Sequence, residues 1–288
     1  MFTLKAPAKI NWSLCVRNRR EDGYHNIHSL MQCIALYDTL TFGQSDSIDF
    51  ISDMTIPPEQ NLVMRAAELL RQHTGVSKGA RITLEKEIPT GAGLGGGSSD
   101  AAQALIGLDR LWGLGLDRGE LILLGGRLGS DVPFFFNAPL AIVSGRGDLL
   151  EPLAIQCSCA LLLVKPPVSV STPWAYAALA SERGENPELT KEVDTINNIK
   201  LIYKALASGN IFHLKSLLHN DFEGVVFGRH PEIGEIKGRL LECGAFMALM
   251  SGSGSVVFGI FESRDKALSA AGHFSPFFSR VVDTVTSS

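Results

Sequence analysis

The sequence predicts an α+β protein built from two lobes. Three observations support this fold class: the N-terminal residues alternate as a strand does, a glycine-rich loop joins a strand pattern to a helix pattern, and helical patterns dominate after about residue 155. A chain of 288 residues is long enough for one large domain or two ordinary ones. We therefore expect a first domain over residues 1–155 and a second over residues 156–288.

The composition is that of a globular protein and argues against several functional classes. With 45% hydrophobic and 19% charged residues, the chain can bury a sizeable core. The net charge of −4 argues against a broad nucleic-acid-binding surface, although it leaves room for a local basic pocket. The cysteines lack the paired spacing of a zinc site or a disulfide framework, which favours reduced thiols. They are Cys15, Cys33, Cys157, Cys159 and Cys243.

The N-terminus and the apolar runs predict a location in the cytoplasm. The first residues have no basic stretch followed by an apolar one, so they do not form a signal peptide. No apolar run approaches the ~20 residues that cross a bilayer. We expect a bacterial cytoplasmic protein without membrane contact; a plastid location would require the removal of a transit peptide.

The first half of the chain reads as strands with two early helices. Residues 2–16 alternate with a period of two, which predicts a strand with one buried side, and an Asp22-Gly23 turn follows. Further strand patterns cover residues 30–41, 48–51, 81–88, 140–144 and 160–164. Helical spacing predicts a helix over residues 61–73 with Gly75 as its C-cap, one after the glycine loop and one after Asp117. Residues 128–136 read as a loop that enters an apolar stretch.

The second half reads as helices with a few closing strands. Helical patterns run from Pro173 to Gly244, interrupted by a polar stretch over residues 182–192 that we expect to be an exposed loop. Two strands then flank a second glycine loop, and a helix over residues 262–271 and a strand over residues 280–285 close the chain.

The segment Pro89–Ser99, P-T-G-A-G-L-G-G-G-S-S, is the most informative feature of the sequence. Its glycines let the backbone approach a ligand closely, and Ser98 or Ser99 can cap the helix that follows. Because a helix N-terminus leaves N–H groups and partial positive charge facing the loop, the segment predicts a polyphosphate site. The alternative is a mobile linker, which the strand before it and the helix after it disfavour. No Lys follows the last glycine, so the segment is not a P-loop. A dinucleotide-binding loop is also disfavoured, because it would need alternating βαβ units that the predicted α+β pattern does not supply.

Two charged residues are candidates for chemistry at such a site. Lys9 lies on the same strand face as Asn11, although a solvated strand face is the simpler interpretation. Asp131 precedes a strongly apolar run, where a carboxylate is costly unless it is paired, and the alternative is a turn that caps the preceding helix. Phosphoryl transfer to an alcohol needs such a pair: a carboxylate to accept the proton and a cation near the phosphoryl group.

Two further features fit a shared cleft, each with a simpler alternative. The second glycine loop at residues 250–255, M-S-G-S-G-S, also reads as an ordinary hairpin loop. Tyr24, His25, Trp174 and Tyr176 offer flat rings for a nucleobase, although composition alone strongly favours ordinary core or surface packing for each of them.

Taken together, these motifs resemble those of the GHMP small-molecule kinases. The motifs are A-P-A-K-I-N at residues 6–11, D-G-Y-H at 22–25, I-P-T-G-A-G-L-G-G-G-S-S-D-A-A at 88–102, L-G-S-D-V-P-F-F at 128–135 and M-S-G-S-G at 250–254. They occur in family order nearly from end to end, and they are most similar to those of the branch that phosphorylates a cytidyl-linked methylerythritol in the non-mevalonate isoprenoid pathway. The resemblance implies an N-terminal lobe like ribosomal protein S5 domain 2, with an unusual left-handed βαβ crossover, and a C-terminal α/β sandwich lobe.

The resemblance also implies a role for each motif residue. Lys9 and Asp131 correspond to the catalytic pair, His25 to the residue that reads the cytosine, and Tyr24 and Tyr176 to its stacking partners, while Asn11 helps to hold substrate or phosphate groups. The ATP-phosphate loop corresponds to Pro89, Thr90, Gly91, Ala92, Gly93, Leu94, Gly95, Gly96, Gly97, Ser98 and Ser99. The third motif corresponds to Ser251, Gly252, Ser253 and Gly254.

The implied function is an ATP- and Mg²⁺-dependent kinase of a small cytidyl substrate. We expect the phosphates, with Ser98 or Ser99, to hold the magnesium, and the protein to act as a monomer or a weak homodimer without nucleic acid. The alternatives are another kinase of the same family, a nucleotide-binding sensor that has lost catalysis, and a dinucleotide-dependent oxidoreductase.

Overall fold

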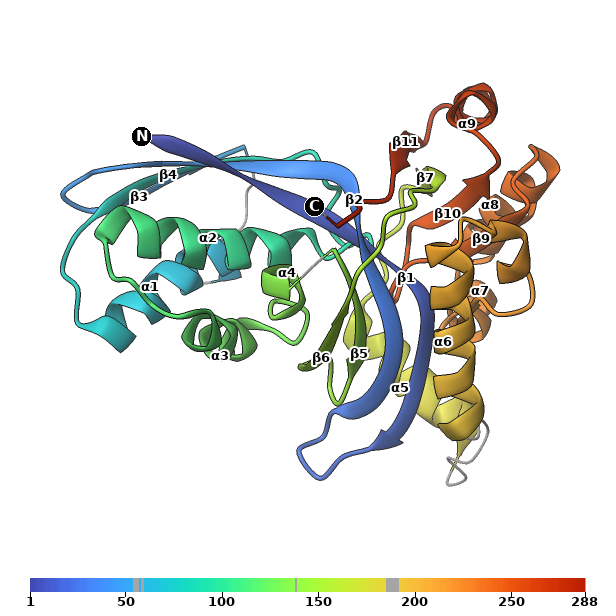
Figure 1. Cartoon of the computed structure of the whole chain (residues 1–288), viewed down its shortest axis with the longest axis horizontal. Coiled ribbons are helices and arrows are strands. Elements are labelled where there is room, and N and C mark those ends of the chain that lie inside the picture. Colours follow the sequence, from blue (N-terminus) through green and yellow to red (C-terminus); the bar gives the residue numbers. More distant parts are fainter. Residues whose placement is uncertain (54–56, 58–59, 138, 185–191, 288) are drawn as a thin grey trace. The chain divides into compact units, whose positions relative to one another are not determined.

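The computed structural model describes residues 1–53, 57, 60–137, 139–184 and 192–287 (Figure 1). The chain forms two compact units, each made of separate stretches of sequence. Unit 1 comprises Met1–Ala8, Leu36–Thr90 and Gly95–Ala138, and unit 2 comprises Lys9–Ala35, Gly91–Leu94 and Pro139–Ser288. Strands β1 (Phe2–Arg19) and β2 (His25–Gly43) contribute residues to both. The division after residue 155 remains a prediction about the domains of the sequence.

Unit 1 is built on a sheet in which β4 (Ala80–Glu85) lies between β3 (Ile48–Ser52) and the second half of β2. β3 and β4 are parallel and are connected through helix α1 (Leu62–Thr74), so they form a βαβ unit. β4 pairs with β2 in the antiparallel sense, with Thr39 opposite Glu85. Alternate residues of β4 are buried, as the period of two predicts.

Helices α1, α2 (Gly96–Trp112) and α3 (Arg118–Leu128) pack against one another in unit 1. Asn61 caps α1 through its side chain, and Gly75 ends it in the left-handed conformation. Asp117 begins α3 with a capping box. Helix α2 comes close to the sheet, because a Cβ at Gly107 would overlap the Phe42 ring.

The first sheet of unit 2 contains the rest of β1 and β2. Its strand order is β8 (His219–Asn220), β1, β2, β5 (Leu140–Ser144) and β6 (Leu149–Leu153). β8 runs parallel to β1, with Ser13 opposite His219. Trp12, fully buried on β1, donates through Nε1 to Gln32 Oε1 at 2.7 Å and meets the Phe258 ring edge-on at 5.9 Å.

The second sheet of unit 2 is antiparallel, with the order β11 (Phe278–Asp283), β7 (Ala160–Lys165), β10 (Val257–Phe261) and β9 (Met247–Met250). Helix α8 (Pro231–Glu242) packs on β9 and β10, and α9 (Arg264–Ala271) packs on β7 and β11. The remaining helical segments of this unit are α5 (Thr172–Arg183), α6 (Glu192–Ala207), η2 (Ile211–Leu214), α7 (Glu223–Arg229) and η3 (Gly272–Phe274).

The α+β prediction is confirmed, with local corrections. The strand from residue 81 ends at Glu85, short of residue 88, and the last helix begins at Arg264, two residues after the predicted start. Part of the predicted loop over residues 128–136 belongs to a short helix, α4 (Phe134–Asn137), because three consecutive phenylalanines are buried there. Most of the predicted loop over residues 182–192 lies outside the described residues. Within the described part of the chain, no helix combines the length and hydropathy that a transmembrane span requires.

Candidate active site

Strand β1 holds Lys9 and Asn11 on one face inside unit 2. Their exposed fractions are 3% and 1%, and every residue from Ala8 to Val16 is buried. The expectation of a solvated strand face is therefore wrong, because β1 is covered on both sides from Lys9 to Val16. A buried ammonium needs a partner, and Lys9 Nζ donates to Asn11 Oδ1 at 2.7 Å.

The Asn11 amide is oriented by hydrogen bonds at both ends. Its Nδ2 donates to Ser29 Oγ at 2.8 Å, and Ser29 Oγ donates in turn to the Ser13 carbonyl oxygen at 2.6 Å. The amide oxygen therefore faces the other way, where it accepts from Lys9 and from the Gly252 N–H at 3.1 Å. Asn11 thus joins the strand lysine to the second glycine loop.

The inner part of the first glycine loop, Gly91–Leu94, belongs to the same unit. The Leu94 carbonyl oxygen accepts from the Lys9 N–H at 2.9 Å, and the Ala92 carbonyl oxygen accepts from the Val256 N–H at 3.1 Å. The Gly93 carbonyl oxygen accepts from Ser251 Oγ at 3.0 Å. Three motifs far apart in sequence are therefore joined by hydrogen bonds around Lys9.

The second glycine loop is the turn of the β9–β10 hairpin, so the simpler interpretation of it is also true. Asn220 holds it through Nδ2, which donates to the carbonyl oxygens of Met250 and Gly252 at 2.7 and 2.8 Å. The contact between the two loops requires glycine at Gly93: its φ is +76°, and a Cβ there would overlap the Ser251 carbonyl oxygen. Ser253 Oγ lies 2.8 Å from Thr172 Oγ1, and Gly254 N donates to the Ser251 carbonyl oxygen at 3.0 Å.

The outer part of the first glycine loop leads into helix α2 of unit 1. The helix begins at Gly96 with Gly95 at the N-cap, so the prediction that Ser98 or Ser99 caps it is wrong. At Gly95 a φ of 70° turns the chain into the helix earlier than a serine cap would. Ser98 and Ser99 instead lie in the first turn. The Ser99 N–H donates to the Gly95 carbonyl oxygen at 2.9 Å, and the N–H groups of Gly96, Gly97 and Ser98 come before this first intrahelical hydrogen bond.

Two buried oxygens near this helix start have no hydrogen-bond partner within the described residues: Ser99 Oγ and Asp100 Oδ1. Ser99 is completely buried and Asp100 is 3% exposed. A hydroxyl oxygen is a ligand that Mg²⁺ accepts, so Ser99 gives this helix start a group that suits a metal-bound polyphosphate.

Sequence reasoning missed a buried charge cluster next to Asp100. Lys86 Nζ donates to Asp100 Oδ2 at 2.7 Å and to Asp38 Oδ2. Asp38, fully buried on β2, also accepts from the backbone N–H groups of Glu87 and Ile88 at 2.7 and 2.8 Å. Burial raises the pKa of Asp100 to about 7; the negative charge of Asp38 adds to this effect, and Lys86 opposes it. The signal in the sequence was an aspartate inside an apolar strand pattern.

Asp131 lies in unit 1, in the turn between α3 and α4, where Val132 N donates to the Gly129 carbonyl oxygen at 3.2 Å. Its side chain is half-buried. Lys9 belongs to unit 2, so their joint role remains a prediction.

A cavity of about 350 Å³ in unit 2 contains two of the predicted substrate residues. His25 and Tyr176 lie on its wall with their rings stacked, at a centroid distance of 5.2 Å and an interplanar angle of 22°. The wall is cationic, with Arg17, Arg19 and Arg183. Tyr24 is 52% exposed, and the Arg146 guanidinium lies 5.5 Å from its ring centre.

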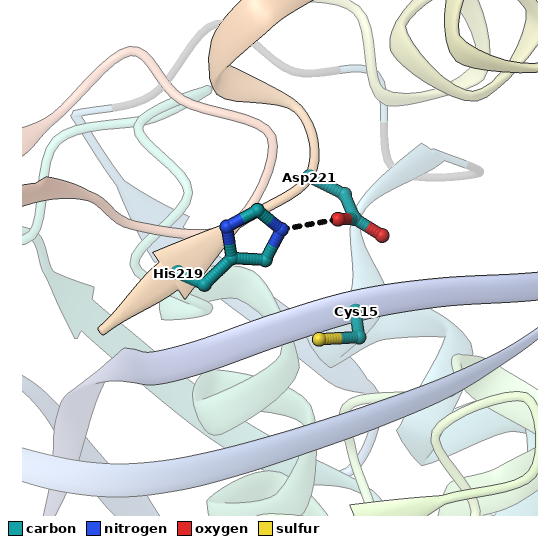
Figure 2. Close-up of side chains that lie close together, drawn as sticks. All are labelled: Cys15, His219 and Asp221. Atoms are coloured by element: carbon teal, nitrogen blue, oxygen red, sulfur yellow. Dashed lines mark hydrogen bonds and ion pairs between the residues drawn. The ribbon is translucent and has the colours of Figure 1, made fainter. Parts of the chain in front are cut away.

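Cys15, His219 and Asp221 form a cluster further along β1 (Figure 2). Each residue offers one atom that could bind a metal ion, and these three atoms lie within 4.8 Å of one another. The cluster is therefore a candidate cation site. The Arg183 guanidinium, however, lies 2.6 Å from Asp221 Oδ2. Its positive charge opposes a cation at this carboxylate, so we interpret the cluster as an ionic network.

Comparisons with known proteins identify the family of this chain. Residues 61–138 match the model of the GHMP kinases N terminal domain, and residues 202–276 match that of the GHMP kinases C terminal. A protein of Thermodesulfovibrio yellowstonii named 4-diphosphocytidyl-2-C-methyl-D-erythritol kinase is 49% identical over 99% of this chain and 98% of its own length. The chain belongs to the GHMP kinase family.

Other GHMP kinases agree in sequence and fold. A Bacillus cereus protein with the same name is 43% identical over 89% of this chain and 87% of its own length. The crystal structure of a 4-(cytidine 5'-diphospho)-2C-methyl-D-erythritol kinase matches with a TM-score of 0.83 and 37% identity, covering 99% of this chain and all of its own. A homoserine kinase from Cytophaga hutchinsonii shares the fold, with a TM-score of 0.76, 19% identity, and coverage of 99% and 94% of the two chains. The resemblance inferred from the motifs is confirmed.

Proposed function

We propose that this GHMP kinase transfers the γ-phosphoryl group of ATP to the 2-hydroxyl of 4-diphosphocytidyl-2-C-methyl-D-erythritol, in the non-mevalonate pathway to isoprenoid precursors. The observation that carries the proposal is the meeting of Lys9, Asn11 and both glycine loops within unit 2, in a chain 49% identical to a kinase of that name. The products are the 2-phosphate and ADP.

The proposed chemistry divides between two charged residues. Asp131 accepts the proton of the 2-hydroxyl while the hydroxyl oxygen forms a bond to the γ-phosphorus. The bond between that phosphorus and the β–γ bridging oxygen breaks, which releases ADP. Lys9 offsets the negative charge that develops on the oxygens, and the contact of Nζ with Asn11 Oδ1 fixes its position.

The proposed ATP site is the segment Pro89–Ser99, and within unit 2 the second glycine loop contacts its inner part, Gly91–Leu94. The N-terminus of α2 supplies partial positive charge and unpaired N–H groups for the phosphates. Magnesium would be held by the phosphates with Ser99 or Ser98, and the buried, unpartnered Ser99 Oγ fits that role. The metal would neutralise charge on the phosphate oxygens.

The proposed substrate site places cytosine in the cavity of His25 and Tyr176. Stacked rings suit a nucleobase, and a neutral imidazole offers one donor and one acceptor to its edge. Burial, and after it the charges of Arg19 and Arg183, lower the pKa of His25, which favours this neutral form. Tyr24 remains a further proposed stacking partner and Asn11 a proposed ligand of substrate or phosphate groups.

The proposal extends to the organisation of the protein. We infer an ATP-binding domain over residues 1–155 and a second domain over residues 156–288, acting in the bacterial cytoplasm as a monomer or weak homodimer. Size-exclusion chromatography with light scattering tests the oligomeric state.

A substrate panel tests the function. The purified protein should release ADP with the cytidyl substrate and not with mevalonate, homoserine or galactose. Asp131→Asn should lower kcat by about 10²–10⁴ while the KM for ATP stays within a factor of about two. Turnover of another alcohol would indicate a different GHMP kinase. ATP binding without ADP release from any alcohol would indicate a sensor, and full activity of Asp131→Asn would exclude this residue as the base.

A further inference from the structure

Asp221 is the buried centre of an ionic network with Arg183 and His219 that the proposed chemistry does not use. Its side chain is 4% exposed and follows strand β8. Oδ2 accepts from the Val16 N–H at 2.6 Å and lies 2.6 Å from Arg183 Nη2, while Oδ1 lies 2.5 Å from His219 Nε2 (Figure 2). Arg183 Nη1 donates to the Val16 carbonyl oxygen at 2.5 Å. Asp221 and Arg183 together therefore bind both backbone groups of one residue of β1.

Arg183 and Val16 both line the cavity that contains His25. Arg183 is the last residue of α5, and it lines the cavity together with Tyr176, Leu179 and Ala180. The spacing of these four residues, i, i+3, i+4 and i+7, puts them on one face of the helix. Because Arg183 fixes the end of that face to Val16 of β1, it also restricts where the ring of Tyr176 can lie.

A second contact ties Tyr176 to the same segment. The Tyr176 ring meets the Phe222 ring edge-on at 4.8 Å, and Phe222 directly follows Asp221. The Phe222 side chain is 1% exposed, and its N–H donates to Asn220 Oδ1 at 3.0 Å. The segment after β8 therefore holds α5 at two points, by charge at Arg183 and by packing at Tyr176.

We propose that Arg183, held by Asp221, is a further specificity-determining residue for the base end of the substrate, because it fixes helix α5 and the Tyr176 ring against strand β1. Asp221 is a positioning residue that acts through Arg183. This inference rests on the proposed function, since it assigns the cytidyl group to the same cavity.

Arg183 also acts on the charge state of His25. The charged and titratable groups on the cavity wall around this imidazole are Arg17 and Arg19 from β1 and Tyr176 and Arg183 from α5. After burial, the positive charges of Arg19 and Arg183 lower the pKa of His25. Removing the guanidinium of Arg183 should therefore raise this pKa, whereas Arg183→Lys keeps a positive charge and loses the two-pronged contact.

The experiment is steady-state kinetics on the full chain with Arg183→Met, Arg183→Lys and Asp221→Asn. In Arg183→Met and Asp221→Asn the KM for the cytidyl substrate should rise roughly tenfold or more, the effect of losing one charge-assisted hydrogen bond. The KM for ATP and kcat should stay within about twofold. Arg264→Met is the matched control, because it breaks the exposed Arg264–Asp283 ion pair of the same unit and should change neither KM.

The double variant separates positioning from independent effects. If Asp221 acts through Arg183, the double variant Arg183→Met/Asp221→Asn should have nearly the KM of Arg183→Met alone. A titration followed by NMR should show a raised His25 pKa in Arg183→Met and a wild-type value in Arg183→Lys. A general loss of structure would instead change kcat and both KM values together.

Three outcomes would overturn the inference: an unchanged KM for the cytidyl substrate in Arg183→Met and Asp221→Asn, an equal rise in the KM for ATP, or additive effects in the double variant. The proposed function fails separately, if the wild-type protein does not turn over the cytidyl substrate at all.

Discussion

Asp100 should make the protein less stable as the pH rises from about 4 to 8. Its carboxyl is buried beside Asp38, and burial is the main reason that its pKa is raised from 3.8 to about 7. Between those two values the folded state keeps a proton that the unfolded state has released, so the free energy of unfolding falls with rising pH. Below this window both states are protonated and above it both are ionised. The free energy of unfolding therefore changes with pH only inside the window, and the stability lost across it stays lost at higher pH.

The size of the effect follows from the two pKa values of Asp100. The difference between 3.8 and about 7 corresponds to a change in the free energy of unfolding on the order of 4 kcal/mol. Lys86, 2.7 Å from Asp100 Oδ2, already opposes the rise in the pKa. The sign is opposite to that of a carboxylate that is stabilised in its ionised form.

The assay is urea unfolding of the wild type and Asp100→Asn at a series of pH values. Asparagine has nearly the same shape and no charge, so the variant should gain stability relative to the wild type from about pH 4 to 8. Asp49→Asn is the control in the same unit. Hydrogen bonds from Ser45 and Ser47 lower the pKa of Asp49, so its stabilising effect is present above about pH 4 and is lost as the pH falls. A stability difference for Asp100→Asn that stays constant from pH 4 to 8 would refute the reasoning.

Two further predictions concern unit 2. Gly93→Ala should lower the free energy of unfolding by more than the roughly 1–2 kcal/mol expected for a left-handed alanine, because the new Cβ would also overlap the Ser251 carbonyl oxygen. The control is Gly75→Ala, where φ is +71° and the space around a Cβ is open, so that urea unfolding measures the backbone strain alone. Equal losses of stability in the two variants would contradict the predicted overlap. The hydrogen bond to Asp221 is the main reason that the pKa of His219 is raised, so the stability from this pair is fully present below pH 6.5 and is lost as the pH rises through the raised value. Thermal unfolding of His219→Gln and wild type should therefore differ most below pH 6.5 and converge once the pH has risen above the raised pKa, and a gap that widens with pH would contradict this.

Regular elements and loop motifs could be predicted from the sequence because their causes are local. The period of two in β4, the helix that follows Asp117 and the glycine at the end of α1 each depend on neighbouring residues. The start of α2 was misplaced for a local reason as well, since a glycine N-cap looks in sequence like one more glycine of the loop.

The burial of Lys9 and the charge cluster of Lys86 could not be predicted, because both depend on contacts distant in sequence. Lys86 is 48 residues from Asp38 and 14 from Asp100. On one strand each charged side chain looks like part of a solvated face, and only the sheet and helix packing around it shows that it is buried. The contact between the two glycine loops could not be predicted from periodicity either. The Ala92 carbonyl oxygen accepts from the backbone N–H of Val256, and such a contact leaves no side-chain pattern.

The charge cluster also bears on how an anion can be held at the start of α2. Two ionised carboxylates beside one ammonium would leave a net negative charge near the N–H groups proposed to bind the ATP phosphates, and like charges repel strongly where burial reduces screening. The raised pKa of Asp100 weakens this conflict, because a protonated carboxyl leaves Asp38 and Lys86 as a neutral pair. On this reasoning Asp38 anchors the backbone after β4 through the Glu87 and Ile88 N–H groups, while Asp100 carries the variable proton. The cluster can then support the glycine loop without weakening the positive end of the helix that follows it.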